Sequence, residues 1–261
     1  MDSTGATIQI ACAQPKLSKS SAENLRIISV FAQKAAWQGC RLVVFPEAAL
    51  IGYDLTNAHA IAIEANNKSE PFRGLKEISE TEGIALAAGF FERDGKKFYN
   101  TYCVFSDGKV VAKYRKAALF PVTGEDRIFT PGDRAATFKL DGFTFGLAIC
   151  YDVRFPKIFE KYAGVDAMVI GACFFHERIA QWEVLVRARA LELQAYAIGC
   201  NALLPEIDCH GYSLIVKPDG SIMGSASEQE QLLTAVLEKK AITETRERIT
   251  TLKDAKKIKL K

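Results

Sequence analysis

Short apolar runs alternate with longer segments of helical periodicity over most of the chain. The runs at residues 8–14 and 41–45 have the length of buried strands, and residues 21–38 between them repeat apolar positions every three or four residues. Ser20 or Ser21 can cap the start of this predicted helix. Because a strand, a helix and a strand follow one another directly, the two strands are predicted to be parallel neighbours in one sheet.

The same alternation continues towards the C-terminus. Helices are predicted within residues 72–82 and over residues 179–194. Turns containing Asp-Gly at residues 94–95 and 107–108 predict antiparallel hairpins between the strands that flank them. Further strands are predicted at residues 84–91, 98–105, 109–114, 137–140, 145–149, 167–172, 196–201, 212–216 and 232–237.

The composition favours one large core over several small ones. Of the 261 residues, 49% are hydrophobic and 25% are charged, which is ordinary for a globular protein. The sequence has no repeat of fixed period, no low-complexity linker and no clear domain boundary. We therefore predict a single α/β domain over residues 1–261, with mixed sheets covered by helices. Residues 240–261 are expected to form a C-terminal extension that serves packing or oligomer contacts.

Charge, cysteine and histidine patterns exclude several classes of protein. The 34 basic and 31 acidic residues give a net charge of +3, so no bulk attraction to nucleic acid is expected. No apolar run approaches the ~20 residues of a membrane span, and no signal peptide is expected at the start. The seven cysteines lie singly, without a C-x-x-C pair, which predicts reduced thiols and a cytoplasmic location. None of the three histidines is at ligand spacing from another, so no metal site is expected.

Three polar side chains stand at the carboxyl ends of predicted strands. They are Glu47, Lys116 and Cys150, and ligand sites of α/β sheets gather at such strand ends. A carboxylate, a cation and a thiol are the parts of an acyl-transfer site, in which the thiol attacks a carbonyl, the carboxylate moves the proton and the cation holds the oxyanion. A helix is predicted over residues 157–162, and near its start the Cys150 thiol is expected to favour its thiolate form. Taken alone, each residue is also explained without function, because cysteines are often buried and charged residues after strands are often solvated.

Three stretches resemble the signature stretches of the nitrilase, or carbon–nitrogen hydrolase, superfamily. They are Phe45-Pro46-Glu47 with Gly52-Tyr53, Tyr114-Arg115-Lys116 with Leu119-Phe120, and Ile149-Cys150-Tyr151-Asp152 with Arg154-Phe155-Pro156. Supporting stretches run nearly the whole chain, among them Asn100-Thr101, Pro131-Gly132-Asp133 and Pro218-Asp219-Gly220. The resemblance is specific, because three motifs occur in the family order and at family-like separations.

The resemblance implies a four-layer α-β-β-α sandwich, a homodimer or higher homo-oligomer, and a Glu–Lys–Cys triad. By it, Glu47 is the general base, Lys116 stabilises the oxyanion and Cys150 is the nucleophile. The implied reaction hydrolyses a small linear carboxamide to a carboxylate and ammonia through a thioester. It needs no metal or organic cofactor.

The resemblance also implies supporting residues around the triad. A second glutamate is expected to orient Lys116; Glu125 matches best, although Asp126 stands next to it. The backbone N–H of Tyr151 is expected to be the second oxyanion donor. The other residues expected at the substrate site are Tyr53, Arg154 and Phe174.

The residues after the nucleophile look most like the amidase branch that includes omega-amidase-like enzymes. Arg154 follows Cys150 by four positions, and its guanidinium suits a carboxylate held by two hydrogen bonds. We therefore expect Arg154 to bind the free carboxylate of a dicarboxylic acid monoamide. The alternative is that Arg154 pairs with Asp152 or with a neighbouring subunit.

The chain departs from the family pattern at several positions that form pocket walls. Ala118 stands where many relatives have His, Gly171 where a Pro is usual, and Tyr212 where the family has the His of Gly-His-Ser. Because the triad is intact, these departures bear on the substrate more than on catalysis. A nitrilase, an N-carbamoyl amide hydrolase and a catalytically silent regulatory protein on the same fold remain the alternative functions.

Overall fold

The chain forms two six-stranded mixed sheets. The computed structural model describes residues 5–255 and 257–259. The first sheet has the order β14-β1-β2-β3-β4-β5, with the bounds β1 (Thr7–Gln14), β2 (Leu42–Val44), β3 (Ala85–Asp94), β4 (Lys97–Ser106), β5 (Lys109–Arg115) and β14 (Gln231–Glu238). The second has the order β13-β12-β9-β8-β7-β6, with the bounds β6 (Thr137–Leu140), β7 (Phe143–Ile149), β8 (Ala167–Ala172), β9 (Tyr196–Asn201), β12 (Leu214–Val216) and β13 (Ile222–Ser225).

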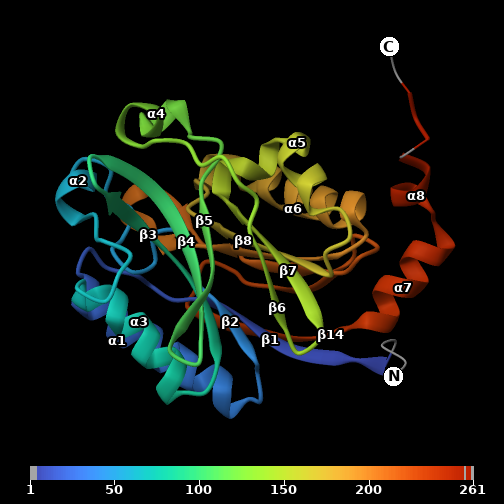
Figure 1. Cartoon of the computed structure of the whole chain (residues 1–261), viewed down its shortest axis with the longest axis horizontal. Helices are drawn as coiled ribbons and strands as arrows, with labels where there is room; N and C mark the ends of the chain where they lie inside the picture. The colour runs from blue at the N-terminus through green and yellow to red at the C-terminus, as the bar shows by residue number, and fades with distance from the viewer. Residues whose placement is uncertain (1–4, 256, 260–261) are drawn as a thin grey trace.

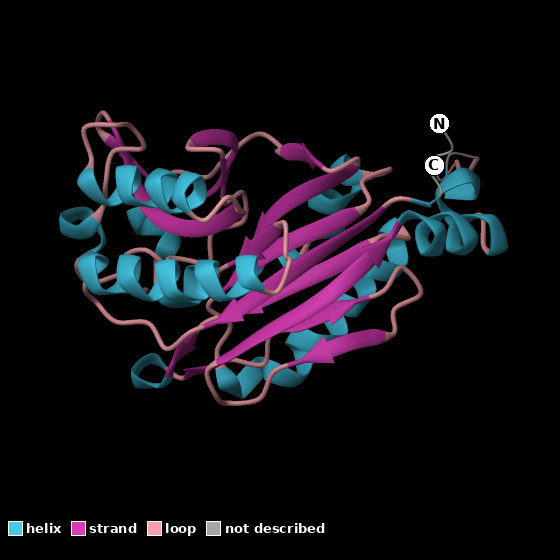
Figure 2. Ribbon diagram, turned by 90° about the horizontal axis from the view of Figure 1, so that it is seen from below, coloured by secondary structure: helices cyan, strands magenta, loops and turns pink. Residues whose placement is uncertain are grey.

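The sheets stack face to face between two outer layers of helices. Side chains of both sheets share one apolar core, to which β1 contributes Ile10 and β8 contributes Val169. The helices α1 (Ser21–Trp37) and α3 (Glu70–Thr81) cover the first sheet, and α5 (Pro156–Phe159) and α6 (Ile179–Leu193) cover the second. Figures 1 and 2 show these helices on the two outer sides of the stacked strands. The predicted four-layer α/β sandwich is confirmed.

Local sequence explains the first layer. The side chain of Ser20 accepts a hydrogen bond from the Glu23 N–H and caps α1, whose apolar face packs on the first sheet. The predicted parallel pairing of β1 with β2 is confirmed, since Ile10 lies opposite Leu42.

Sheet topology brings strand ends together. The strand β5 pairs antiparallel with β4, and β4 pairs antiparallel with β3, which is parallel to β2. Hence β2 and β5 run in the same direction, and their carboxyl ends lie at one edge of the first sheet. In the second sheet β7 and β8 are parallel, so their carboxyl ends also share an edge.

Several short helices were absent from the sequence-based expectations. The segment after β7 was expected to lead into a helix over residues 157–162. It is instead a 3₁₀ helix, η3 (Cys150–Arg154), followed by α5 and a second 3₁₀ turn, η4 (Glu160–Tyr162). The other additions are α2 (Ala58–Ile61), α4 (Glu125–Ile128), η2 (Pro121–Thr123), η5 (His176–Arg178), η6 (Pro205–Ile207) and a two-stranded pair, β10 (Leu203–Leu204) with β11 (Cys209–His210).

The C-terminal segment forms α7 (Lys239–Arg248) and α8 (Thr251–Ala255) at one end of the sandwich (Figure 1). The helix α7 is mostly polar, and only Ile242 is buried. Arg246 donates a hydrogen bond of 2.6 Å to the carbonyl of Val165, and this contact fastens α7 to the second sheet. Among the described residues, no helix combines the length and the apolar character needed to cross a lipid bilayer.

Candidate active site

Glu47 lies fully buried in a tight turn after β2. The next residue, Ala48, has a φ of 53°, in the left-handed region. Gly89 of β3 passes close to this turn, and a Cβ added there would lie 2.5 Å from the Ala48 nitrogen. A glycine at this position therefore lets the strand approach and hold the base in place.

Lys116 sits between two carboxylates. Its Nζ is 2.8 Å from Glu47 Oε1 and 2.9 Å from Glu125 Oε1. The Asn100 amide donates to the same two oxygens, at 2.7 and 3.1 Å, and the Tyr53 hydroxyl donates to Glu125 at 3.0 Å. These contacts fix the positions of both carboxylates around one cation.

The charges in this cluster determine its protonation. Burial raises the pKa of Glu47 above its ordinary value of 4.5; Lys116 opposes that shift and Glu125 adds to it. Burial alone would lower the pKa of Lys116, but Glu125 and Glu47 outweigh it and raise the pKa well above 10.5. One ammonium can neutralise only one of two carboxylates, so Lys116 stays charged while Glu47 is disposed to accept a proton.

The Cys173 peptide joins the base to the thiol. Its N–H donates to Glu47 Oε2 at 2.8 Å, and its carbonyl accepts from the Cys150 Sγ at 3.7 Å. Cys173 directly follows β8, which is the parallel neighbour of β7, and β7 leads directly into Cys150. Stacking of the sheets thus brings a carboxylate of one sheet to a thiol of the other.

The turn that carries Cys150 is built on a buried carboxylate. Cys150 has a φ of 44°, and Asp152 accepts hydrogen bonds from the Ile149 N–H at 2.9 Å, the Ala118 N–H at 2.7 Å and the Tyr114 hydroxyl at 2.8 Å. Burial raises the pKa of Asp152 to about 6, against the effect of these hydrogen bonds. Asp152 thus ties η3 to the chain around Lys116.

The expected resting thiolate is not supported. Burial raises the pKa of Cys150 well above 9.0, the negative charge of Glu47 adds to this rise, and Lys116 opposes it. The expectation counted only the favourable field of a following helix. That segment is a short 3₁₀ turn, and desolvation dominates. The thiol is therefore protonated at rest and must lose its proton to a base as it reacts.

A small pocket opens at Cys150. Aromatic rings and two guanidinium groups form most of its wall. Arg154 lies 5.3 Å from the centre of the Phe174 ring, and Arg178 lies 5.6 Å from that of Phe120. The full lining is Tyr53, Phe120, Cys150, Tyr151, Arg154, Cys173, Phe174, Phe175 and Arg178.

The structure brings together the residues that the sequence singled out. The sequence offered two neighbouring candidates for the carboxylate that orients Lys116. The structure favours Glu125, since Glu125 is buried against Lys116 whereas Asp126 is exposed. The alternative pairing of Arg154 with Asp152 is not formed: Arg154 donates to Gln181 at 2.7 Å instead. All eight proposed site residues lie in the pocket or the buried cluster behind it.

Sequence reasoning missed three contributors. Cys173 acts through its backbone, and Arg178 belongs to an unpredicted 3₁₀ turn, so no sequence pattern indicated a role for either residue. Asn100 did have a signal, because Asn100-Thr101 is a supporting stretch of the resemblance, but no role was assigned to it.

The departure at Gly171 has a steric reason. A Cβ at this position would lie 2.4 Å from the ring of Tyr102. The Tyr102 hydroxyl donates to the carbonyl of Phe45, which leads into the turn of Glu47. The space that a larger residue would need is therefore filled by a side chain that supports the base.

Comparison with known proteins agrees with this geometry. A family model described as carbon-nitrogen hydrolase matches residues 9–247. The 2-oxoglutaramate amidase of Bacillus subtilis (strain 168) is 30% identical, over 95% of this chain and 97% of that protein. Omega-amidase NIT2 of Mus musculus is 31% identical, over 95% of this chain and 94% of that protein. The crystal structure of Saccharomyces cerevisiae Nit3, a member of branch 10 of the nitrilase superfamily, has a TM-score of 0.86 and 27% identity, covering 95% of this chain and 96% of that one.

Proposed function

The chain belongs to the carbon–nitrogen hydrolase family and is an enzyme acting on amides, and we propose that it hydrolyses a small linear carboxamide through a thioester on Cys150. The observation that carries this mechanism is the Cys173 peptide, which binds Glu47 on one side and the Cys150 thiol on the other. A base and a nucleophile held by one peptide can exchange a proton without large movement.

The first half of the reaction forms the acyl-enzyme. Glu47 takes the thiol proton as Cys150 Sγ attacks the amide carbon, and the charge that develops on the amide oxygen is stabilised by Lys116 and the Tyr151 N–H. The carbon–nitrogen bond then breaks. Glu47 returns the proton to the leaving nitrogen, and ammonia departs.

The second half restores the thiol. Glu47 removes a proton from water, which attacks the thioester carbon. The carbon–sulfur bond breaks, the carboxylic acid product leaves, and Cys150 recovers the proton from Glu47. The raised pKa of Glu47 suits a group that must accept and release a proton in each half-reaction. Glu125 keeps Lys116 in place throughout.

We propose a monoamide of a short dicarboxylic acid as the substrate. Arg154 reaches the pocket without an ion-pair partner among the described residues, and a guanidinium there suits a substrate carboxylate. The relatives named 2-oxoglutaramate amidase and omega-amidase support the same class, because 2-oxoglutaramate is itself such a monoamide. Arg178, which pairs with the exposed Glu177, adds a second cation to the pocket wall.

We further propose that the enzyme works in the cytoplasm as a homodimer. All seven cysteines are unpaired, which suits a reducing compartment. The outer face of the second sheet exposes apolar side chains on α6 and at the start of α5, including Val184 and Phe155. These support a subunit interface on that face. Residues 240–261 are proposed to contribute to packing or subunit contacts; residues 256, 260 and 261 lie outside the described part.

The nucleophile can be tested directly. Cys150→Ala is expected to abolish ammonia release while the circular dichroism spectrum stays unchanged, because a sulfur atom is removed and nothing is overpacked. Intact mass spectrometry of the unaltered enzyme with a slow amide should show one acyl adduct, located on Cys150. Cys40→Ala, at a buried thiol away from the pocket, is the matched control and should keep full activity. Turnover by Cys150→Ala above a trace level would show that another group is the nucleophile.

The carboxylate preference is tested at Arg154. A partly desolvated charge pair of this kind is worth on the order of 2–4 kcal/mol, and a Lys cannot reproduce the planar fork. Arg154→Lys should therefore lower kcat/KM for an acidic monoamide by roughly 30- to 1000-fold, with far less loss for a neutral amide of equal length. Equal losses for both amides would show that Arg154 is structural, while the acyl-enzyme chemistry would still stand.

A further inference from the structure

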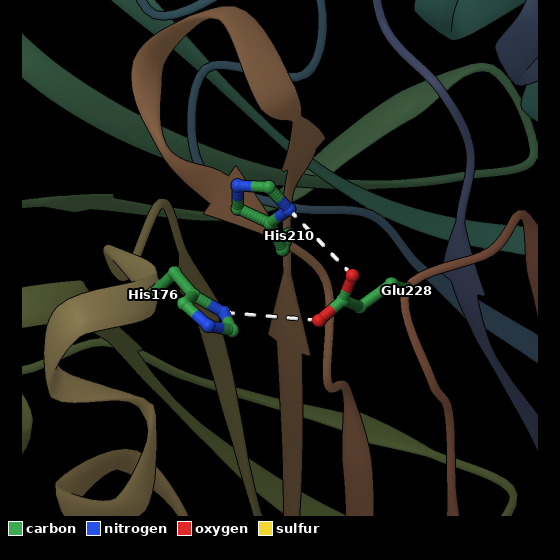
Figure 3. Close-up of side chains that lie close together, drawn as sticks. All are labelled: His176, His210 and Glu228. Atoms are coloured by element: carbon green, nitrogen blue, oxygen red, sulfur yellow. Dashed lines mark ion pairs between the residues drawn. The ribbon is translucent and has the colours of Figure 1, made fainter.

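Two of the three histidines meet a carboxylate at the surface, although they are far apart in the sequence. His176 opens η5, His210 ends β11, and Glu228 lies in the loop between β13 and β14. One ligand atom from each lies within 4.8 Å of the others. Figure 3 shows the carboxylate beside the two imidazole rings, with one oxygen facing each ring.

The nitrogen atoms of this cluster face the carboxylate without hydrogen bonding to it. His176 Nδ1 and His210 Nδ1 are each 3.9 Å from a Glu228 oxygen. That separation is too long for a hydrogen bond. It is close to the roughly 3.4 Å between neighbouring ligands of a tetrahedral zinc ion with bonds of about 2.05 Å.

Neighbouring groups orient the three side chains. The Tyr212 hydroxyl donates a hydrogen bond of 2.5 Å to Glu228 Oε1. The far nitrogen of His210, Nε2, is 3.4 Å from Asp208 Oδ1. The backbone N–H of His176 donates to the backbone carbonyl of Asp208 at 2.7 Å, which holds the two segments together. A ligating imidazole that faces a carboxylate through its other nitrogen is the usual support of a metal-binding histidine.

We propose that His176, His210 and Glu228 bind a divalent transition-metal ion of the zinc class. Two imidazoles and one carboxylate suit Zn²⁺ or Co²⁺, whereas Mg²⁺ and Ca²⁺ prefer oxygen ligands. His176 and Glu228 are exposed, so small rotations can close the remaining distance and water can fill the fourth position. The site is separate from the catalytic cluster and takes no part in the thioester chemistry.

The proposed metal site adjoins the wall of the pocket at Cys150. His176 directly follows Phe175, and Arg178 ends the same 3₁₀ turn. Both Phe175 and Arg178 line the pocket. An ion that joins His176 to His210 and Glu228 would hold this wall against β11 and the β13–β14 loop.

The experiment titrates Co²⁺ into the complete, ligand-free protein and follows the visible absorption of the ion. One ion should bind per chain, and Zn²⁺ should displace it while Mg²⁺ should not. Glu228→Gln and His210→Gln should each weaken binding at least about 10-fold, and Tyr212→Phe should weaken it by roughly 10-fold by removing the orienting hydrogen bond. His59→Gln is the matched control: His59 stacks on Phe98 away from the cluster, so binding should not change.

Binding should also stabilise the fold. At 100-fold excess over its Kd, Zn²⁺ should raise the Tm by on the order of 5 °C in the unaltered protein, and by far less in Glu228→Gln. Circular dichroism and the Tm without metal establish that each variant is folded. Equal affinity of Glu228→Gln, His210→Gln and the unaltered protein would overturn the proposal. A second result would also overturn it: sulfur-to-cobalt charge-transfer absorption in the unaltered protein, together with loss of Co²⁺ binding in Cys150→Ala. These two observations would show that the ion binds to the catalytic thiol.

Discussion

At the scale of single residues, the properties of Glu47 follow from how charge is shared in a buried cluster. Glu47 and Glu125 compete for the single ammonium of Lys116, and none of the three groups is exposed to water. Neighbouring donors satisfy both carboxylates but do not remove the excess negative charge. The cluster can therefore take up a proton more readily than an isolated glutamate, and Glu47 is the group closest to the thiol's hydrogen-bonding peptide.

The activity should depend on pH through Glu47. A base acts only when it is ionised, so kcat/KM should fall as the pH drops through the pKa of Glu47. Because that pKa is raised, the loss should occur above pH 4.5, the value of an ordinary glutamate. Initial rates of ammonia release over a range of pH measure the acid limb.

Glu47→Gln gives the companion result. It should block both half-reactions, because the same carboxylate is proposed to serve acylation and hydrolysis. Formation of the acyl-enzyme at normal speed in this variant, followed by rapid-quench mass spectrometry, would disprove the shared base. If the residual kcat/KM of Glu47→Gln still falls at low pH as in the unaltered enzyme, the titrating group is not Glu47.

At the scale of elements, the turn after β7 depends on one internal anchor. A four-residue α5 cannot hold Cys150 by itself, and the positive φ of Cys150 is an unfavourable conformation for its side chain. Asp152 offsets this strain by accepting two backbone N–H groups and one hydroxyl. The proposed oxyanion donor, the Tyr151 N–H, belongs to the same turn, between Cys150 and Asp152.

Asp152→Ala should therefore be strongly destabilising. It leaves two buried donors and one partly buried donor without an acceptor, and each buried group of this kind costs about 1–3 kcal/mol. Urea denaturation should show a loss of at least about 3 kcal/mol in the free energy of unfolding, together with a loss of activity. Asp126→Ala, at an exposed aspartate of α4, is the control and should change stability by less than about 0.5 kcal/mol. A loss below about 1 kcal/mol for Asp152→Ala would show that the turn is held by other contacts.

At the scale of the whole molecule, the two outer layers differ in what they expose. On α6, Trp182 faces inward and is fully buried, whereas Val184 is 64% exposed. Leu191 on the same helix and Phe155 at the start of α5 are also exposed. This apolar surface beside the catalytic turn is the proposed interface with a second copy of the chain.

Val184→Glu should convert the proposed dimer to a monomer, because a charge would be buried in the proposed interface. Light scattering at micromolar protein concentration measures the mass. Val30→Glu is the matched control, since Val30 is 48% exposed on α1 in the opposite outer layer, and it should remain a dimer. A monomeric unaltered protein would contradict the proposed assembly, and a dimeric Val184→Glu would place the interface elsewhere.

The amino-acid sequence by itself determined the main strands and helices and the identity of the central chemical groups. The spacing of apolar residues within a strand or helix depends only on residues close together in the sequence. It therefore predicted β1, α1, β2, α3 and α6. The resemblance selected Glu47, Lys116 and Cys150, because each motif is a short run of adjacent positions. The mostly polar α7 carried no such period; its place comes from contacts such as that of Arg246 with Val165.

Only the tertiary structure decided which distant groups meet and what their environment does to them. Stacking of the sheets brings the Cys173 peptide between Glu47 and Cys150, and it brings His176, His210 and Glu228 together from three separate elements. Burial also reversed the expected protonation of Cys150, since desolvation outweighs the field of a short turn. Such effects depend on distances through space and on exclusion of water, and neither can be predicted from residues that are neighbours in the sequence.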